Sequence, residues 1–478
     1  MKFGFSCLQT FGCKTYLFFC VIFFLPGLIH SQQGDANNNK VNGYKGIWFT
    51  LGQFGEYGDK YSGGLGTYTA KHVPLAIYAP EVDKTFFVYG GTTGEHDRYL
   101  LCMIGCFDHE SGMVSRPTVV YDKKGVDDPH DNPSLAIDEE GYIWVFVSGR
   151  GRNRPGFKYR SSEPYSIAQF DQVTEEEMTY PQPKYINGKG FLNLFTKYTG
   201  VRELYFETSA DGKDWTDDVK LSSIKREGDE RSGHYQMSSV REGKVGTFFN
   251  WHPNGNVDRR TNLYYLETTD YGKTWTDING KEMKLPLRDL DVSARAMDYY
   301  TLSKNVYLKD MEFDRNGHPA GLYITSGGHE AGPENGAREW HLIRWNGDDW
   351  EDQVICTSDH NYDMGSLMIN GEEWRIIVPG GNSPQEHGGG GEIEIWSSKD
   401  SGSNWELTKN VTKNSIRNHN YVRKVINGTD PFLYFWADGN PDRFSPSIMY
   451  FGDSEGNVWQ LPYDMSSDNQ VPVRVKFY

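Results

Sequence analysis

Two stretches, TTDYGKTW at 268–275 and SKDSGSNW at 398–405, decide the fold of this chain. Both follow the Asp-box pattern S/T-x-D-x-G-x-x-W, and SADGKDW at 209–215 is a form one residue shorter. In such a turn the Asp side chain caps backbone amides, the Gly takes a positive φ, and the Trp packs beneath the hairpin. The pattern is typical of propeller repeats, where it is structural, so we assign it no chemistry.

Strand pairs with hairpin cues recur around these turns. Four strands with their turns need roughly 40–60 residues, the size of one propeller blade. We therefore predict an all-β fold, a seven-bladed β-propeller of four-stranded antiparallel blades over 44–465, closed where one terminus completes a blade with the other. The inner strands are predicted to start near His72, Asn132, Tyr185, Tyr235, Val306, Tyr362 and Tyr421.

The two ends of the chain are predicted to lie outside the propeller. Residues 1–31 have the pattern of a secretion signal, with early lysines followed by the apolar run YLFFCVIFFLPGLI. A single membrane anchor is the alternative, but this run is short and is broken by a Pro-Gly pair. Residues 32–43 are predicted to be a flexible lead-in and 466–478 a C-terminal tail. We expect a periplasmic or secreted monomer that is free of the membrane once the signal is removed.

Composition excludes one class of partner. The chain carries a net charge of −16, yet 14% of its residues are aromatic and 53 are glycine. This profile fits a soluble protein of many short strands and tight turns. A protein that binds phosphate backbones would carry a basic surface, so we expect no nucleic acid partner.

Histidines are placed unevenly along the chain. Five predicted units open on a histidine, and nine of the 13 histidines lie at unit starts or in the loops expected on the same face. Each of these loops also carries His, Arg or Lys, so an acidic protein concentrates cations on one face. We interpret this face as an electropositive funnel for an anionic ligand. The five unit-opening histidines are His72, His130, His234, His360 and His419.

The residue types in these loops favour proton abstraction beside a carboxylate. A catalytic carboxylate pair, as most glycosidases use, is not evident there. Arg or Lys neutralises a substrate carboxylate, one His or Tyr removes the α-proton, and another protonates the departing oxygen. On a uronic acid this β-elimination gives a 4,5-unsaturated uronate, and the leaving group is a sugar, or water in a dehydratase. The reaction needs no cofactor; a structural calcium ion in the loops DPHDN (128–132) or DGNPD (438–442) is the alternative.

Three segments resemble the BNR-repeat family that includes seven-bladed propeller polysaccharide lyases. They are GYKGIWFTLGQFGEYGDKYSGGLGTYTAKHVPLAIY (43–78), PHDNPSLAIDEEGYIWVFVSGRG (129–151) and TYPQPKYINGKGFLNLFTKY (179–198). The family's lyases are the ulvan lyases and the rhamnose–glucuronate lyases or rhamnosidases. The resemblance spans most of 43–465 and is weaker after the third predicted blade. It implies a carbon–oxygen lyase acting on ulvan-like or rhamnose–glucuronate chains, with a non-reducing terminal uronate as the reacting sugar.

The resemblance also implies roles for single residues. His130 matches the catalytic His of the second blade, whereas a second family His is replaced here by Arg150. Tyr180 and Tyr235 match two family tyrosines, and Lys197 aligns with a carboxylate-binding Arg. His72 matches a first-blade His of the rhamnose–glucuronate branch. Because Arg150 stands where a histidine is expected, the ulvan-lyase acid/base arrangement does not carry over intact.

We therefore predict His130, Tyr235, His72 and Tyr180 as catalytic residues on an anionic oligosaccharide or polysaccharide. A glycoside hydrolase, such as a rhamnosidase or sialidase, and a non-catalytic sugar-binding propeller are the alternatives. No metal ligands are predicted. The predicted substrate-binding residues are Arg150, Lys197, His234, His252, Arg259, His329 and His360.

Overall fold

The computed structural model describes residues 36–60, 62–63, 71–199, 201–380 and 383–477. The chain divides into two units, Met1–Gln33 and Gly34–Tyr478, and the predicted signal lies outside the described residues. Apart from three one-turn helices, the regular structure described in the second unit is β-sheet. None of the helices found in the described segments is long and apolar enough to cross a membrane.

Five four-stranded antiparallel sheets follow one another within the described residues. Each sheet is a series of consecutive strands joined by antiparallel pairing, as predicted. The first three are β10–β13 (Pro133–Ile137, Ile143–Val147, Gly156–Ser161, Phe170–Glu176), β14–β17 (Thr179–Ile186, Gly190–Lys197, Glu203–Ser209, Val219–Ser222) and β18–β21 (Gln236–Arg241, Lys244–Trp251, Thr261–Thr268, Arg295–Met297). The other two are β22–β25 (Asn305–Phe313, Pro319–Ser326, Arg338–Trp345, Trp350–Ser358) and β26–β29 (Ser366–Asn370, Glu373–Gly380, Glu392–Ser398, Glu406–Asn410).

A sixth, 14-stranded sheet joins both ends of this unit. Its first series is β1 (Gly46–Thr50), β4 (Ser62–Gly63), β5 (Ala76–Ala79), β6 (Lys84–Gly91), β7 (Leu101–Asp108), β8 (Met113–Ser115) and β9 (Thr118–Asp122). Its second series is β30 (Asn418–Thr429), β31 (Phe432–Gly439), β32 (Ser445–Ser447), β33 (Met449–Gly452), β34 (Val458–Gln460), β35 (Asn469–Gln470) and β36 (Val473–Val475). The two series meet where β5 and β30 pair in parallel and where β1 pairs with β32.

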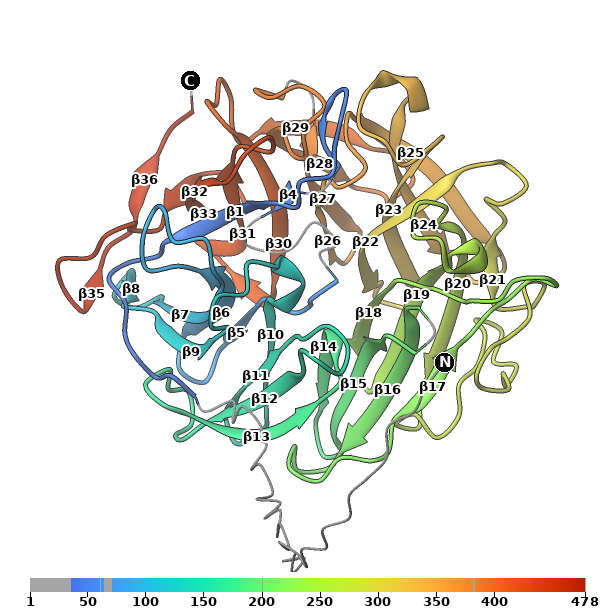
Figure 1. Cartoon of the computed structure of the whole chain (residues 1–478), viewed down its shortest axis with the longest axis horizontal. Coiled ribbons are helices and arrows are strands. Elements are labelled where there is room, and N and C mark those ends of the chain that lie inside the picture. The colour runs from blue at the N-terminus through green and yellow to red at the C-terminus, as the bar shows by residue number, and fades with distance from the viewer. Residues whose placement is uncertain (1–35, 61, 64–70, 200, 381–382, 478) are drawn as a thin grey trace, which may run out of the picture. The chain divides into compact units, whose positions relative to one another are not determined.

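The sheets of the second unit lie around a common centre, with β10, β14, β18, β22, β26 and β30 innermost (Figure 1). The pairing of β1 with β32 confirms that an N-terminal strand closes the ring with the last strands. This arrangement is a β-propeller. Seven blades stay a prediction, because β5–β9 and β30–β36 belong to one continuous sheet.

Both predicted flanks are more ordered than expected. Residues 36–43 run beside β9, where the Asn38 amide donates to the Val119 carbonyl at 2.8 Å and the Val41 amide to Pro117 at 3.1 Å. At the other end, β35 pairs with β8 and β36 with β34. The described parts of the lead-in and of the tail are therefore held by sheet hydrogen bonds.

The Asp boxes form the predicted turns after the third strand of three sheets. In the box at 268–275, the Thr274 amide donates to Asp270 Oδ1 at 2.9 Å and Gly272 has a φ of 82°. Trp275 is 1% exposed and lies in the core between β16 and β20. The boxes at 209–215 and 398–405 repeat the Asp-capped amides and the positive-φ glycine. The hairpin chemistry inferred from the pattern is confirmed.

One inner strand begins earlier than predicted. β14 starts at Thr179, whereas the start was expected near Tyr185. The prolines at 181 and 183 argue against a strand because they have no amide hydrogen to donate. Since β14 is the innermost strand of its sheet, it pairs only with β15 there, and its register shifts between Thr179 and Gln182. A missing donor on an unpaired edge costs no ladder hydrogen bond, so both prolines are accommodated.

Candidate active site

The four side chains predicted to be catalytic form a continuous group of aromatic rings. The ring centroid of Tyr180 lies 5.3 Å from that of His72, 5.7 Å from that of His130 and 5.7 Å from that of Tyr235. Tyr235 lies 5.0 Å from His252. All five residues are at most 3% exposed. We call these five residues the aromatic chain.

Four of the five members of the aromatic chain lie at or just before the start of a strand, and His252 follows β19. His72 precedes β5, and His130 lies in the one-turn helix η1 (Pro129–Asp131) that leads into β10. Tyr235 directly precedes β18, where the Asn250 side chain accepts its backbone amide at 2.9 Å. Tyr180 has a φ of 55°, a left-handed conformation that is rare for a bulky side chain and often marks functional sites. Residues far apart in the sequence thus converge because successive blades begin at the same end of the ring.

His130 is held by a carboxylate between two guanidinium groups. Asp128 accepts the His130 backbone amide at 3.0 Å and contacts its ring Nδ1. Asp128 also accepts from Arg150 at 2.8 Å and from Arg154 at 2.6 Å. Burial, followed by the charges of Arg150 and Arg154, holds the pKa of His130 well below 6.5. The imidazole is therefore neutral at pH 7, and Asp128 favours the tautomer that carries hydrogen on Nδ1 and a lone pair on Nε2.

Guanidinium groups also surround the tyrosines. The guanidinium carbon of Arg202 lies 5.9 Å from the ring centre of Tyr198 and 5.9 Å from that of Tyr235. Arg260 lies 5.0 Å from the Tyr235 ring, and Arg150 lies 5.9 Å from the Tyr198 ring. Burial acts to lower the pKa of Arg202, but the phenols of Tyr235 and Tyr198 outweigh it and raise that pKa. These arginines remain charged, so they can neutralise an anionic group beside the aromatic chain.

Several buried polar atoms around this group have no hydrogen-bond partner in the described structure. They are the hydroxyl of Tyr180, one terminal nitrogen of Arg202, and both ring nitrogens of His252. Leaving a buried donor or acceptor unsatisfied costs about 1–3 kcal/mol, so such atoms are rare in folded proteins. Their gathering at one place indicates that polar groups of a ligand complete their hydrogen bonds.

His72 and His234 are held by backbone groups. His72 Nε2 donates to the His130 carbonyl at 2.9 Å, and burial lowers the pKa of His72 to about 3. This hydrogen bond helps to hold the backbone of His130 in place. His234 Nδ1 lies 2.8 Å from the Asn250 carbonyl, and its Nε2 accepts from the Ile224 amide at 3.2 Å. Both nitrogens of His234 are engaged, which fits a structural role better than the predicted contact with substrate.

Four other predicted residues are not brought to the aromatic chain by any contact found in the described structure. Lys197 forms an ion pair with Asp218. Arg259 is exposed and lines a separate hollow of about 390 Å³. The side chain of His329 is 36% exposed and lies 3.8 Å from Asp258. His360 is buried in another part of the ring, where it accepts from the Tyr362 amide at 3.1 Å. Their predicted role in substrate binding has no geometric support here.

The sequence analysis singled out the wrong member of the Arg259–Arg260 pair for this cluster. Arg260 is 3% exposed and faces Tyr235, whereas its neighbour Arg259 faces solvent. Both residues precede β20, which begins at Thr261, so no strand alternation predicts which of the two side chains is buried. Lys197, Tyr198 and Arg202 belong to one predicted loop. The sequence carries no signal that shows which of these three side chains lies beside the aromatic chain.

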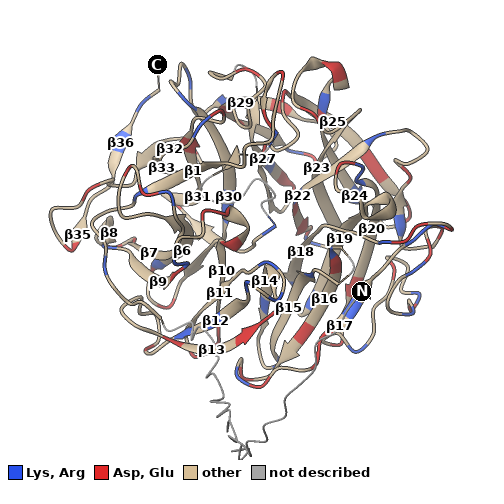
Figure 2. Cartoon of the chain, in the orientation of Figure 1, with Lys and Arg blue, Asp and Glu red and all other residues tan. Residues whose placement is uncertain are grey.

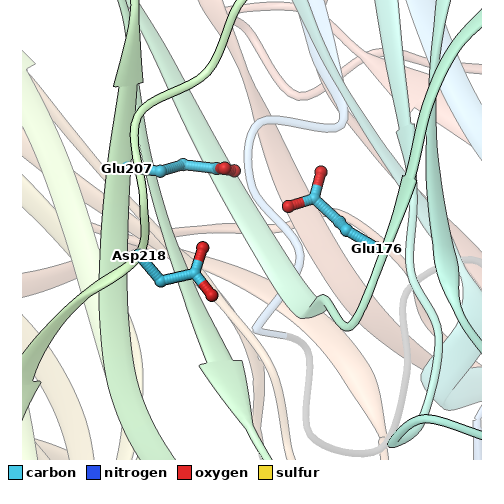
Figure 3. Close-up of side chains that lie close together, drawn as sticks. All are labelled: Glu176, Glu207 and Asp218. Carbon is cyan, nitrogen blue, oxygen red and sulfur yellow. The ribbon is translucent and has the colours of Figure 1, made fainter.

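Three carboxylates, Glu176, Glu207 and Asp218, converge elsewhere (Figure 3). Lysines supply the positive charge there: Lys158 lies 2.9 Å from Glu207 and also pairs with Glu176, while Lys197 pairs with Asp218. Burial is the largest effect on the pKa of Glu207 and raises it to about 8. Lysine amines therefore already surround these carboxyls, and a metal ion at this place would have to compete with them.

The two loops considered for calcium also carry ion pairs. Asp131 lies 2.8 Å from Lys123 and 3.0 Å from Arg154, and Asp438 accepts from Arg417 at 2.9 Å. A calcium ion in either loop would have to compete with these side chains. Basic and acidic residues are interspersed around the ring, with blue and red segments on many strands and loops (Figure 2).

Comparison with known proteins agrees with this architecture. The chain is 21% identical over 390 residues to an ulvan lyase of Pseudoalteromonas sp. (strain PLSV), covering 71% of this chain and 76% of that one. It is 21% identical over 257 residues to an ulvan lyase of Alteromonas sp. (strain LOR), covering 47% and 52%. A solved ulvan lyase bound to -[GlcA(1-4)Rha3S]- superimposes with a TM-score of 0.67 at 16% identity, over 88% of this chain and 96% of that one.

The fold and the site together define a β-propeller with a His/Tyr/Arg centre at one end of its ring. Residues 110–357, more than half of the chain, match the BNR repeat-containing family. The chain belongs to this family.

Proposed function

We propose that this protein is a polysaccharide lyase that cleaves uronate-containing chains by β-elimination. The observation that carries the proposal is the contact of neutral His130 with Tyr180, whose buried hydroxyl is unsatisfied, beside the guanidinium groups of Arg150 and Arg202. A neutral base, a phenol that keeps its proton and a carboxylate-neutralising cation are the three groups that this reaction needs.

The proposed reaction assigns each group one task. Arg202 and Arg150 bind the uronate carboxylate and stabilise the negative charge that develops as the C5 proton leaves. His130 Nε2 accepts that proton, and the electron pair of the C5–H bond becomes the C4–C5 double bond. The C4–O bond breaks, and the departing oxygen takes a proton from the hydroxyl of Tyr180 or Tyr235. Burial raises the pKa of Tyr180 well above 10, so this phenol is protonated at neutral pH and can act as the acid.

The relatives support the class of substrate. Two sequence relatives are ulvan lyases, and a structural relative is bound to a chain of glucuronate and sulfated rhamnose. The cationic surroundings of the aromatic chain suit such an anionic sugar. A protein exported to the periplasm or secreted, as the first 31 residues predict, would meet this polymer outside the cytoplasm.

The burial of the site favours attack at a chain end. The five rings are nearly inaccessible, whereas Arg150 is exposed and Tyr198 and Arg202 are half-buried in front of them. A terminal uronate has a neighbouring sugar on one side only, whereas an internal uronate must bring its neighbours on both sides to such a buried site. The leaving group is then the rest of the oligosaccharide, or water where the terminal 4-position is a free hydroxyl.

Mass spectrometry of products from defined ulvan and rhamnose–glucuronate oligosaccharides tests this function. We expect an unsaturated uronate lighter than the hydrolysis product by one water. Loss of water from an intact oligosaccharide would identify the dehydratase form of the same elimination. Fragments that all carry the added water of hydrolysis would contradict the proposal and favour a glycoside hydrolase.

A further inference from the structure

A second cavity, of about 1040 Å³, lies at the far ends of the inner strands. The aromatic chain lies where these strands begin, whereas the cavity is lined by their later residues, among them Lys184, Ser238 and Lys424. Along β14, Tyr180, Gln182 and Lys184 lie successively farther from the candidate active site. The cavity therefore lies at the opposite end of the ring.

A layer of hydrogen bonds separates the two sites. The Gln182 side chain donates to the carbonyls of Lys71 and Gln236, each at 3.0 Å. Its oxygen accepts from the Ser238 hydroxyl at 2.6 Å. Because Gln182 lies between Tyr180 and Lys184 on β14, this layer lies between the aromatic chain and the cavity. The cavity is thus a site of its own.

The acidic groups of the cavity wall already have partners. Lys424 lies 3.2 Å from Asp310 and 2.6 Å from Glu312. Asp310 also accepts the Leu367 amide at 2.8 Å, and Glu312 accepts the Ser239 hydroxyl at 3.0 Å. One lysine and several neutral donors therefore stabilise these two carboxylates without Lys184.

Lys184 is a buried lysine of this wall for which the described structure shows no ion pair. It is 5% exposed, and the contacts recorded among the described residues include no hydrogen bond or ion pair of its amino group. Burial, followed by the nearby charge of Lys424, lowers the pKa of Lys184 to about 7, although the charges of Glu312 and Asp310 act in the opposite direction. A lysine amine buried without a partner is costly unless something else neutralises it. The surrounding wall combines this amine with apolar side chains, including Leu135, Met311 and Met368.

We propose that this cavity binds a small organic carboxylate, with Lys184 as its counter-ion and the apolar wall against its carbon skeleton. This site does not depend on the proposed lyase activity, because it lies at the other end of the ring.

Isothermal titration of the whole protein with butyrate at pH 8.0, in two buffers of different ionisation enthalpy, tests the site. Lys184 is mostly neutral at this pH, so binding of an anion should take up a fraction of a proton that approaches one. Neutral butyramide should bind far more weakly. Lys184→Met should lower the butyrate affinity by about tenfold or more, the effect of one charge-assisted hydrogen bond. Lys189→Met, at an exposed lysine in the following turn, is the matched control.

The stability of Lys184→Met provides an independent readout. Removing an unpaired buried amine should leave the melting temperature unchanged or raise it, and butyrate should raise the melting temperature of the wild type only. Equal butyrate binding by wild type and Lys184→Met, or binding without proton uptake, would overturn the proposal. Binding of sulfate with the same proton uptake, in place of butyrate, would overturn the carboxylate assignment. A strongly destabilised Lys184→Met would also contradict it, because Lys184 would then have a structural partner.

Discussion

Tyr180 connects the groups of the candidate site. Its ring contacts His72, His130 and Tyr235, its backbone is left-handed, and its buried hydroxyl has no partner in the described structure. The left-handed backbone and the unsatisfied hydroxyl cost stability, whereas the ring contacts offset this cost in part. A residue that is unfavourable for folding and central to a cluster is expected where function has been selected over stability.

Tyr180→Phe separates the role of the hydroxyl in catalysis from the role of the ring in packing. We expect kcat to fall by about 100-fold or more if the hydroxyl is the proton donor. The melting temperature should not fall, because the substitution removes an unsatisfied polar atom and keeps the ring. Tyr185→Phe, on the same strand but only partly buried, is the matched control in a lyase assay and a thermal melt. Full activity of Tyr180→Phe would exclude this hydroxyl as the acid.

Arg202→Gln tests the neutralisation of the carboxylate. Loss of one preorganised charge at the developing anion should lower kcat/KM by about 100-fold or more. Arg152→Gln, whose side chain is 88% exposed, should leave kcat/KM within about twofold, as expected for a surface charge. Steady-state kinetics of the two variants provide the comparison. Equal effects of the two substitutions would remove Arg202 from the site.

At the scale of elements, the Asp-box turn fixes the third and fourth strands of its sheet to the neighbouring blade. Gly272 has a φ of 82°, and a Cβ atom there would approach the Phe206 ring at 2.8 Å. Gly280, in a nearby turn, has a φ of 78° with open space around it. The two glycines share the backbone conformation and differ in packing.

Gly272→Ala and Gly280→Ala should therefore differ in stability. The left-handed conformation costs a non-glycine residue about 1–2 kcal/mol in either variant. Gly272→Ala should lose at least about 1 kcal/mol more, because its methyl group clashes with Phe206. Urea unfolding of both variants measures the difference. Equal losses would show that the turn does not pack tightly against β16.

The sequence predicted these elements better than it predicted the site. Asp boxes and hairpin turns are local, since a few neighbouring residues determine their geometry, and they were found where expected. His130, His72, Tyr180 and Tyr235 were also found together, because the starts of inner strands share one end of a propeller. Arg260 and Lys197 could not be assigned from the sequence. Arg260 lies in the connection before β20, where no alternation predicts the buried side chain. Lys197 pairs with Asp218, which no local pattern reveals.

At the scale of the whole molecule, buried histidines couple stability to pH. Burial lowers the pKa of His72, His360 and His419 to about 3 and that of His234 to about 4. The unfolded chain takes up these protons near pH 6.5. Their stabilising contribution is therefore complete above about pH 6.5 and is lost as the pH falls towards 3–4. Two buried carboxyls act in the opposite sense, since burial raises the pKa of Asp363 to about 7 and that of Glu207 to about 8.

Each of the four histidines should accordingly lower the free energy of unfolding as the pH falls from 6.5 to 4.5, whereas the two carboxyls should raise it. Each histidine contributes a slope of up to about 1.4 kcal/mol per pH unit. His419, whose Nδ1 accepts from the Trp436 indole at 2.9 Å, must lose this bond when it is protonated there. His419→Gln should flatten the slope, whereas His318→Gln, at a half-buried surface site, should not. Chemical denaturation at several pH values measures the slopes, and equal slopes for His419→Gln and the wild type would contradict the prediction.

The central claim is that residues converging at one end of the ring perform β-elimination. The most direct measurement is the ultraviolet absorbance of an unsaturated uronate during incubation with ulvan or rhamnose–glucuronate oligomers, for the wild type and His130→Gln. We expect steadily rising absorbance with the wild type and at least a hundredfold slower rise with the variant, at an unchanged melting temperature. Sugar release by the wild type without new absorbance, or an equal rise with His130→Gln, would contradict it.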